Sequence, residues 1–257
     1  MPTVEHDGAT LRYATEGEGP TVAFCSDAGL GVWEWSYLLG ALPGTVETLV
    51  WEYRGTGDSD DPDGSYPVSD IVADLDAVLA DHGARSVHLV GAGLGGQVAV
   101  EYARRHGRPD TLALFGTPAE PDDLDGGTLD RLRSAGRDPA ALTDSMDALL
   151  SPDALAHDEE VSRMVEWRQA DDASEAGWDA QAEAFRSHAI AEPYEVTTPA
   201  LVAHGVADAL VDPAAGERLA DELPRGRHQP VEGGHCCFVE SAGAVADELV
   251  AWVDSET

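Results

Sequence analysis

Apolar residues recur along this chain in two patterns, as short β-branched runs and as longer stretches with the spacing of a helix. The clearest helix is predicted over 68–82, where apolar residues stand at 68, 71, 72, 75, 78 and 79 and Gly83 ends the pattern. Other helices are predicted over 33–42, 213–223 and 242–253, and strands over 9–15, 21–26, 46–53, 87–90, 112–115, 201–203 and 227–231. Because helices separate most of these strands, we expect an α/β fold, a mostly parallel central sheet with helices on both faces.

The alternation of strands and helices stops between about 118 and 195. This stretch holds short, acidic, helical pieces and no convincing strand. Strand spacing resumes near Ala200, so an insertion above the sheet explains the stretch better than a second domain does. We therefore predict one α/β core, made of residues 1–117 and 196–257, with a helical lid at 118–195. The aromatic and methionine side chains of the lid are expected to form its own core.

The most informative segment is 87–106, where an apolar run enters a glycine-rich turn and continues as an amphipathic helix. This is the context of a nucleophile elbow, Gly-x-Ser-x-Gly, in which a strained turn exposes one side chain above a sheet. The middle position here is Gly93, so we expect an elbow without its nucleophile. The glycines also fit the dinucleotide pattern Gly-x-Gly-x-x-Gly, but Thr111 stands where an acidic residue would be needed. We therefore expect no bound cofactor.

Acidic residues outnumber basic residues along the whole chain. The sequence contains 49 Asp and Glu against 15 basic residues, all of them Arg, for a formal net charge of -34. A carboxylate-covered surface repels itself at low salt and is tolerated at high salt, which predicts the cytoplasm of a salt-accumulating halophile. The same charge argues against nucleic acid and anionic membrane as partners, and we find no signal peptide or membrane span. We expect a small-molecule substrate or ligand, and the oligomeric state stays open.

The chain has three cysteines, Cys25, Cys236 and Cys237. An odd number, with two residues adjacent, makes a poor disulfide framework. No Cys-x-x-Cys or other metal-ligand spacing is present, so no metal site is expected. We predict that the three cysteines are buried free thiols.

Five segments, in this order along the chain, resemble motifs of the α/β-hydrolase fold family, in particular the small lidded type that includes lactonases, esterases and epoxide or haloalkane hydrolases. They are the strand end at 24–29 with Trp35 downstream, the Arg-Gly-x-Gly-x-Ser-like loop at 53–59, the elbow at 91–96, the strand end at 204–208 and the loop at 233–235. Any one of them is weak evidence. Together, in the expected strand and helix context, they strongly support the α/β-hydrolase fold.

The resemblance implies roles for particular residues. Asp208 is expected to be the acid that orients His235, and His235 the base that takes a proton from the nucleophile. The other histidines, including His204, are expected to be structural or exposed. The backbone N–H groups of Leu94 and Ala28 are expected to form the oxyanion hole. Only the nucleophile position, Gly93, is vacant.

Two further residues depart from the family pattern. Ser26 and Asp27 stand where the family usually has His-Gly, so both are pocket candidates. A carboxylate about 4 Å from a developing oxyanion would cost roughly 4 kcal/mol at an effective dielectric of 20. Either Asp27 points away from the hole, as it would if it capped a turn, or the pocket is not built for an acyl oxyanion. Ser26 is also the best candidate for a displaced nucleophile, ahead of Cys25 and Cys236.

Three functions therefore stay open. The first is a hydrolase-type enzyme that uses His235 and Asp208 as a general base on a small, partly hydrophobic substrate. The second is a pseudoenzyme that keeps the lidded pocket to bind a ligand or a partner. The third is a serine hydrolase whose nucleophile was lost or replaced at Gly93. Ordinary serine catalysis is not expected, because loss of the triad serine lowers turnover roughly a million-fold.

Overall fold

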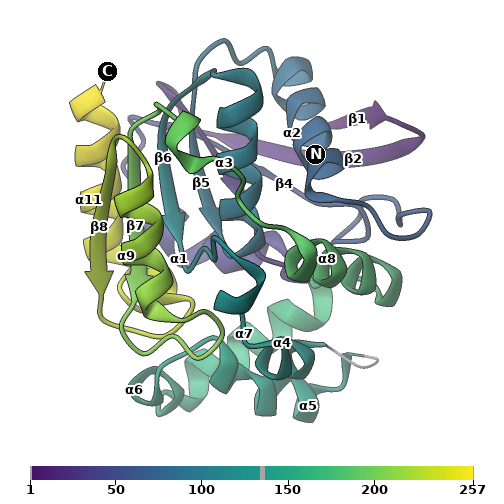
Figure 1. Cartoon of the computed structure of the whole chain (residues 1–257). Helices are drawn as coiled ribbons and strands as arrows, with labels where there is room; N and C mark the ends of the chain where they lie inside the picture. The colour runs from purple at the N-terminus through teal and green to yellow at the C-terminus, as the bar shows by residue number, and fades with distance from the viewer. Residues whose placement is uncertain (1, 134–136, 257) are drawn as a thin grey trace.

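The computed structural model describes residues 2–133 and 137–256, and these form one eight-stranded sheet in the order β1-β2-β4-β3-β5-β6-β7-β8 (Figure 1). The first pairings, β1 with β2 and β2 with β4, are antiparallel, and all the others are parallel. This sheet confirms the predicted fold class. The strands are β1 Thr3–His6, β2 Ala9–Glu16, β3 Thr21–Cys25, β4 Glu47–Trp51, β5 Val87–Ala92, β6 Pro109–Phe115, β7 Ala200–Gly205 and β8 Gly226–Val231.

Helices cover both faces of this sheet, with α2, α3 and α9 on one face and α1 and α11 on the other (Figure 1). The predicted helix over 68–82 is α2, which ends at Gly83 with a left-handed φ of 84°. The bounds are η1 Val32–Trp35, α1 Ser36–Ala41, α2 Val68–His82, α3 Leu94–His106, α9 Pro213–Glu222, α10 Cys237–Glu240 and α11 Ala242–Glu256. Within the described residues, no helix has the length and apolar character that a membrane span requires.

Two details of the predicted elements are wrong. The edge strand β1 is absent from the prediction, because its side chains are only partly buried and carry no clear apolar alternation. The helix expected over 33–42 is divided into the 3-10 turn η1 and the helix α1. In η1 the side chain of Glu34 is directed inward and is fully buried.

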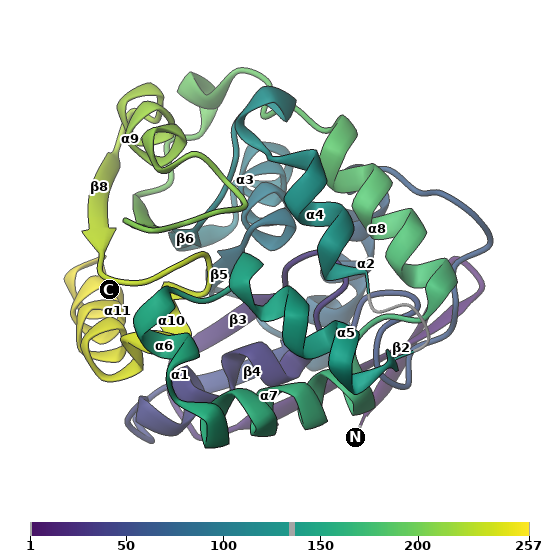
Figure 2. The ribbon, with the colours of Figure 1, turned by 90° about the horizontal axis from the view of Figure 1, so that it is seen from below.

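The segment between β6 and β7 is helical, and Figure 2 shows it spread across one end of the sheet. Four of its helices begin at a side chain that accepts a backbone N–H bond, from Asp125, Asp138, Ser151 or Ser174, as helix caps do. Its helices are η2 Pro121–Asp123, α4 Gly126–Leu132, α5 Pro139–Asp144, η4 Ser145–Ala148, α6 Pro152–Leu155, α7 Asp158–Asp171, α8 Glu175–Ser187 and η5 Pro193–Glu195.

The register of the central strands decides which loops meet. Cys25 pairs with Gly91, and Ala92 pairs with Phe115. Parallel strands bring their carboxyl ends to one edge of the sheet. The loops that follow β3 and β5 therefore lie side by side, at the end of the sheet that faces the helical segment.

Candidate functional site

The turn between β5 and α3 has the strained shape of an elbow. Gly93 has φ 48° and ψ -113°, a conformation that side-chain-bearing residues rarely adopt, and its N–H donates to the carbonyl of Phe115 at 2.9 Å. A Cβ on Gly95 would lie 1.9 Å from the carbonyl oxygen of Cys25. The glycines therefore let the turn pack directly against the end of β3.

The side chain of Asp27 lies over this turn. A Cβ on Gly93 would lie 1.9 Å from Asp27 Oδ1, so the carboxylate fills the space into which a side chain at position 93 would project. Asp27 Oδ1 accepts hydrogen bonds from the backbone N–H groups of Ala28 at 2.7 Å and Leu94 at 2.8 Å. These are the two donors that the family resemblance assigns to the oxyanion hole. The idea that Asp27 points away from the hole is wrong, because its own carboxylate occupies both donors.

His235 lies between two carboxylates. Its Nδ1 is 2.8 Å from Asp208 Oδ2, and its Nε2 is 2.9 Å from Asp27 Oδ2. His235 and Asp27 are each only 1% exposed. Burial alone would lower the pKa of His235, but the charges and hydrogen bonds of Asp208 and Asp27 raise this pKa well above its ordinary value. The raised pKa favours the positively charged form of His235 between these two acidic side chains.

Asp208 is fixed by the turn that follows β7. Its Oδ1 accepts from the N–H groups of Leu210 and Val211 at 2.8 and 2.9 Å. Its Oδ2 also lies 3.0 Å from Nε2 of His204, which is buried. Burial would raise the pKa of Asp208, but His235 and His204 hold it well below its usual value. His204 therefore belongs to the site as a buried residue that supports Asp208. The expectation of a structural or exposed residue does not include this contact, which the position of His204 four residues before Asp208 suggests.

Glu34 is a second site residue that sequence reasoning did not find. It is fully buried, and its Oε1 accepts the backbone N–H of Asp27 at 2.9 Å. Its Oε2 has no hydrogen-bond partner among the described residues. Burial, and then the charge of Asp27, raise the pKa of Glu34 well above its ordinary value, which favours the neutral form of this carboxyl. Glu34 holds the backbone of Asp27 through the bond to its N–H.

The other nucleophile candidates are not placed to serve the histidine. Ser26 Oγ accepts from Trp35 Nε1 at 3.2 Å, whereas His235 Nε2 is bonded to Asp27. The cysteines are free and buried, as predicted. Burial raises the pKa of Cys25 to about 12 and that of Cys236 well above its ordinary value, so neither is a thiolate at neutral pH.

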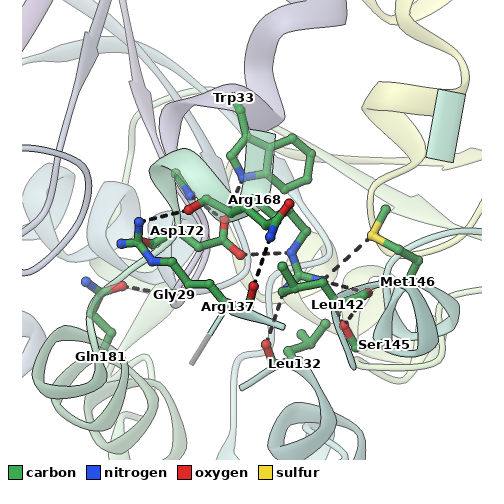
Figure 3. A network of polar contacts seen from close by, with 12 residues as sticks. Gly29, Trp33, Leu132, Arg137, Leu142, Ser145, Met146, Arg168, Asp172 and Gln181 are labelled. Atoms are coloured by element: carbon green, nitrogen blue, oxygen red, sulfur yellow. Dashed lines mark hydrogen bonds and ion pairs between the residues drawn. The ribbon is translucent and has the colours of Figure 1, made fainter. Parts of the chain in front are cut away.

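The helical segment forms hydrogen bonds with the loop that carries Asp27. The side chain of Gln181, on α8, accepts the N–H of Gly29 at 2.7 Å. Asp172, which follows α7, accepts from Trp33 Nε1 at 2.7 Å and from the N–H of Gly31 at 3.3 Å. Figure 3 shows Trp33 beside Asp172, and Gln181 beside Gly29. The loop after β3 is therefore held from both sides, by the elbow and by the helical segment.

A buried ion pair holds Asp172 in position for these hydrogen bonds. Arg168 Nε lies 2.8 Å from Asp172 Oδ2, and both side chains are almost completely buried. The remaining Arg168 donors reach Ser145 Oγ at 2.8 Å and the carbonyl of Leu132 at 3.1 Å (Figure 3). Asp172 stays inside because Arg168 compensates its charge, and Arg168 connects it to two other helices of the segment, α4 and η4.

The side chains of Asp27 and His235 are shielded from solvent in this structure. A cavity of about 760 Å³ lies beside it, between α6–α7 and the loops after β7 and β8. Its lining includes Tyr37, Leu150, Met164, Val206 and Gly233, and it does not reach Asp27 or His235. Among residues 2–133 and 137–256, no group of His, Cys, Asp or Glu is arranged to hold a metal ion.

Known proteins share both this sequence pattern and this architecture. The sequence profile described as "Alpha/beta hydrolase family" matches residues 22–248. A protein of Variovorax paradoxus (strain S110), named as a carbamate hydrolase RutD, is 30% identical over 93% of this chain and 94% of its own length. The enol-lactonase of Burkholderia xenovorans LB400 superposes with a TM-score of 0.87 at 24% identity, covering 98% of this chain and 100% of its own. A thermophilic esterase of Thermogutta terrifontis gives 0.86 at 22% identity, covering 100% and 99%.

Proposed function

Because this chain belongs to the alpha/beta hydrolase family, we propose that it is a hydrolase that works without an elbow serine. Its substrate is a small, partly hydrophobic molecule, and the helical segment 118–195 is the lid that closes over it. The observation that carries the proposal is the chain of buried contacts from Asp208 through His235 to Asp27. Buried groups with strongly shifted pKa values cluster at functional sites.

His235 and Asp208 are the acid–base pair of this hydrolase. Asp208 bonds Nδ1 of His235, so Nε2 is directed at the space above the elbow, where Asp27 lies. An acyl-enzyme on Gly93 cannot form, because this residue has no side chain. The related proteins are named as hydrolases of carbamates, lactones and esters. Hydrolysis is the reaction class that their names and this site share.

His235→Ala tests this function. Turnover of a panel of small esters, lactones, carbamates and alkyl halides is measured at high salt, and we expect a loss of about 10²–10⁴-fold in the variant, typical for removing an acid–base group. His106→Ala is the matched control, because His106 is exposed in the last turn of α3, at the end of that helix opposite to the elbow. Full activity of His235→Ala would refute the proposal.

A second candidate function is ligand binding without turnover. The observation in its favour is that Asp27 Oδ1 already occupies both backbone donors in a site that is shielded from solvent. A binding protein would show a rise in melting temperature with a panel compound at high salt, while chromatography finds that compound unconsumed. Consumption of the compound that depends on His235 would exclude this second function.

A further inference from the structure

We propose that Asp27 is the nucleophile of this site and that it attacks a saturated carbon whose leaving group departs as a stable anion, as in a primary alkyl halide. The inference rests on the proposed function, since it assumes that the site hydrolyses a substrate. It goes further because it assigns the nucleophile to the loop after β3 instead of the elbow, and it names the chemical class of the substrate.

The two oxygens of Asp27 have different environments. Oδ1 is fixed by the N–H groups of Ala28 and Leu94, and Oδ2 faces His235 Nε2 at 2.9 Å. The backbone of Asp27 is held by Glu34, and Gly93 leaves the space that the carboxylate occupies. A buried carboxylate with one oxygen anchored and the other beside an acid–base group has the arrangement of a positioned nucleophile.

The occupied donors argue against attack on a carbonyl. A substrate carbonyl would develop its oxyanion where no donor is free, because Ala28 and Leu94 already bond Asp27 Oδ1. Loss of a single such donor costs an acyl-transfer enzyme about 10²–10³-fold in turnover. Displacement at a saturated carbon forms no oxyanion on the substrate, so this reaction does not need free N–H donors in the oxyanion hole.

The position of His235 restricts the leaving group. In a displacement the leaving group departs in line, on the side of the carbon opposite to the attacking oxygen. His235 lies beside that oxygen, Asp27 Oδ2, so it cannot protonate a group that leaves on the far side. The substrate must therefore carry a group, such as bromide, that is stable as an anion without a proton.

The first step forms an ester on Asp27. A lone pair of Oδ2 forms the new bond to carbon, and the electrons of the carbon–halogen bond leave with the halide ion. The ester carries no charge, so His235 loses one of the two carboxylates that raise its pKa. The pKa of His235 falls, the imidazolium releases its proton to solvent, and Nε2 becomes a base.

The second step hydrolyses the ester. His235 Nε2 takes a proton from water, and the hydroxide attacks Cγ of Asp27. The oxyanion forms on Oδ1, where the N–H groups of Ala28 and Leu94 already point. Collapse breaks the bond from Cγ to the alkoxide oxygen, and the alkoxide takes the proton from His235. The hydroxyl left on Asp27 passes its proton to Nε2. The net reaction converts the alkyl halide and water to alcohol, halide and a proton.

Turnover of 1-bromobutane in H₂¹⁸O tests the assignment. Bromide release is followed by ion chromatography at high sulfate, and the protein is then digested for mass spectrometry. We expect ¹⁸O in the peptide that carries Asp27 and none in the peptide that carries Asp208. His235→Gln is expected to stop after the first step, so its Asp27 peptide gains the mass of one butyl group in place of one proton.

Asp27→Asn is expected to lose bromide release and the label, while Asp63→Asn, an exposed carboxylate change, keeps both. If Asp27→Asn does not fold, ¹⁸O labelling of the wild-type chain still shows whether Asp27 is the nucleophile. Turnover of any panel compound that needs His235 but leaves Asp27 unlabelled would overturn the assignment and keep the proposed function. Absence of turnover and of any adduct on the whole panel would overturn both.

Discussion

At the scale of single residues, the side chain of Asp27 and the missing side chain of Gly93 have to be considered together. The carboxylate of Asp27 lies where a Cβ at position 93 would be, at 1.9 Å from Oδ1. The Asp27 carboxylate can therefore take this position only because residue 93 has no side chain. A serine hydrolase that had simply lost its serine would keep an empty space above the elbow, and here that space is filled.

Gly93→Ser should therefore destabilise the protein and produce no esterase. Overpacking against Asp27 and the left-handed φ of 48° together cost about 3 kcal/mol or more in the free energy of unfolding. In the double variant Asp27→Gly/Gly93→Ser the clash is gone and both N–H donors are free, so we expect hydrolysis of p-nitrophenyl acetate. Urea unfolding of the two single variants and the double variant gives the coupling. If the loss of unfolding free energy in the double variant equals the sum of the two single losses, the side chains at 27 and 93 do not compete for one space.

The raised pKa of His235 predicts a loss of stability at alkaline pH. Unfolded His235 releases its proton near pH 6.5, whereas the folded chain keeps it to a higher pH. Between these two values the native state binds one more proton, so stability falls by about 1.4 kcal/mol per pH unit. Urea unfolding from pH 6 upward should show this slope in the wild type. His235→Gln, which cannot titrate, should show a slope smaller by that amount, and equal slopes would refute the charge state.

At the scale of elements, the helical segment contains a buried ion pair, Arg168–Asp172, and Asp172 joins it to the core by accepting hydrogen bonds from Gly31 and Trp33. Asp172→Asn keeps the shape but leaves Arg168 buried without a compensating charge, which costs about 3–5 kcal/mol. Amide hydrogen exchange at Gly29 and Gly31 should accelerate in this variant. Glu175→Gln, in an exposed pair with Arg133, is the control and should change stability by less than about 1 kcal/mol. Equal effects of the two variants would show that burial of the pair is unimportant.

The elements were largely predictable, and the contacts between them were not. The helical period of α2 and the apolar runs of β5 and β7 are local signals, and the structure has all three elements. The order of motifs also led to Asp208 and His235, which the structure places 2.8 Å apart. The position of the Asp27 carboxylate depends on the pairing of β3 with β5.

Glu34 and His204 were missed for a related reason. Each is a polar residue whose burial depends on partners far away in the sequence or on a neighbouring loop. Periodicity reports which positions face a core, but it carries no information on which buried polar groups meet there. Glu34 is an example, since the bond from the Asp27 N–H to its buried carboxyl has no local sequence signature.

At the scale of the whole molecule, the net charge of -34 should make stability depend on salt. The charges are spread over the chain, so repulsion between them acts on the entire folded surface and not on one element. The Debye length shrinks from about 10 Å at 0.1 M to about 3 Å at 1 M salt, which removes most of this repulsion. We expect the melting temperature to rise with KCl over this range. Sucrose at matched osmolality is the control, because it does not screen charge. A melting temperature that stays flat in KCl would show that the repulsion is already balanced within the fold, and it would remove the reason to place this chain in a salt-rich cytoplasm.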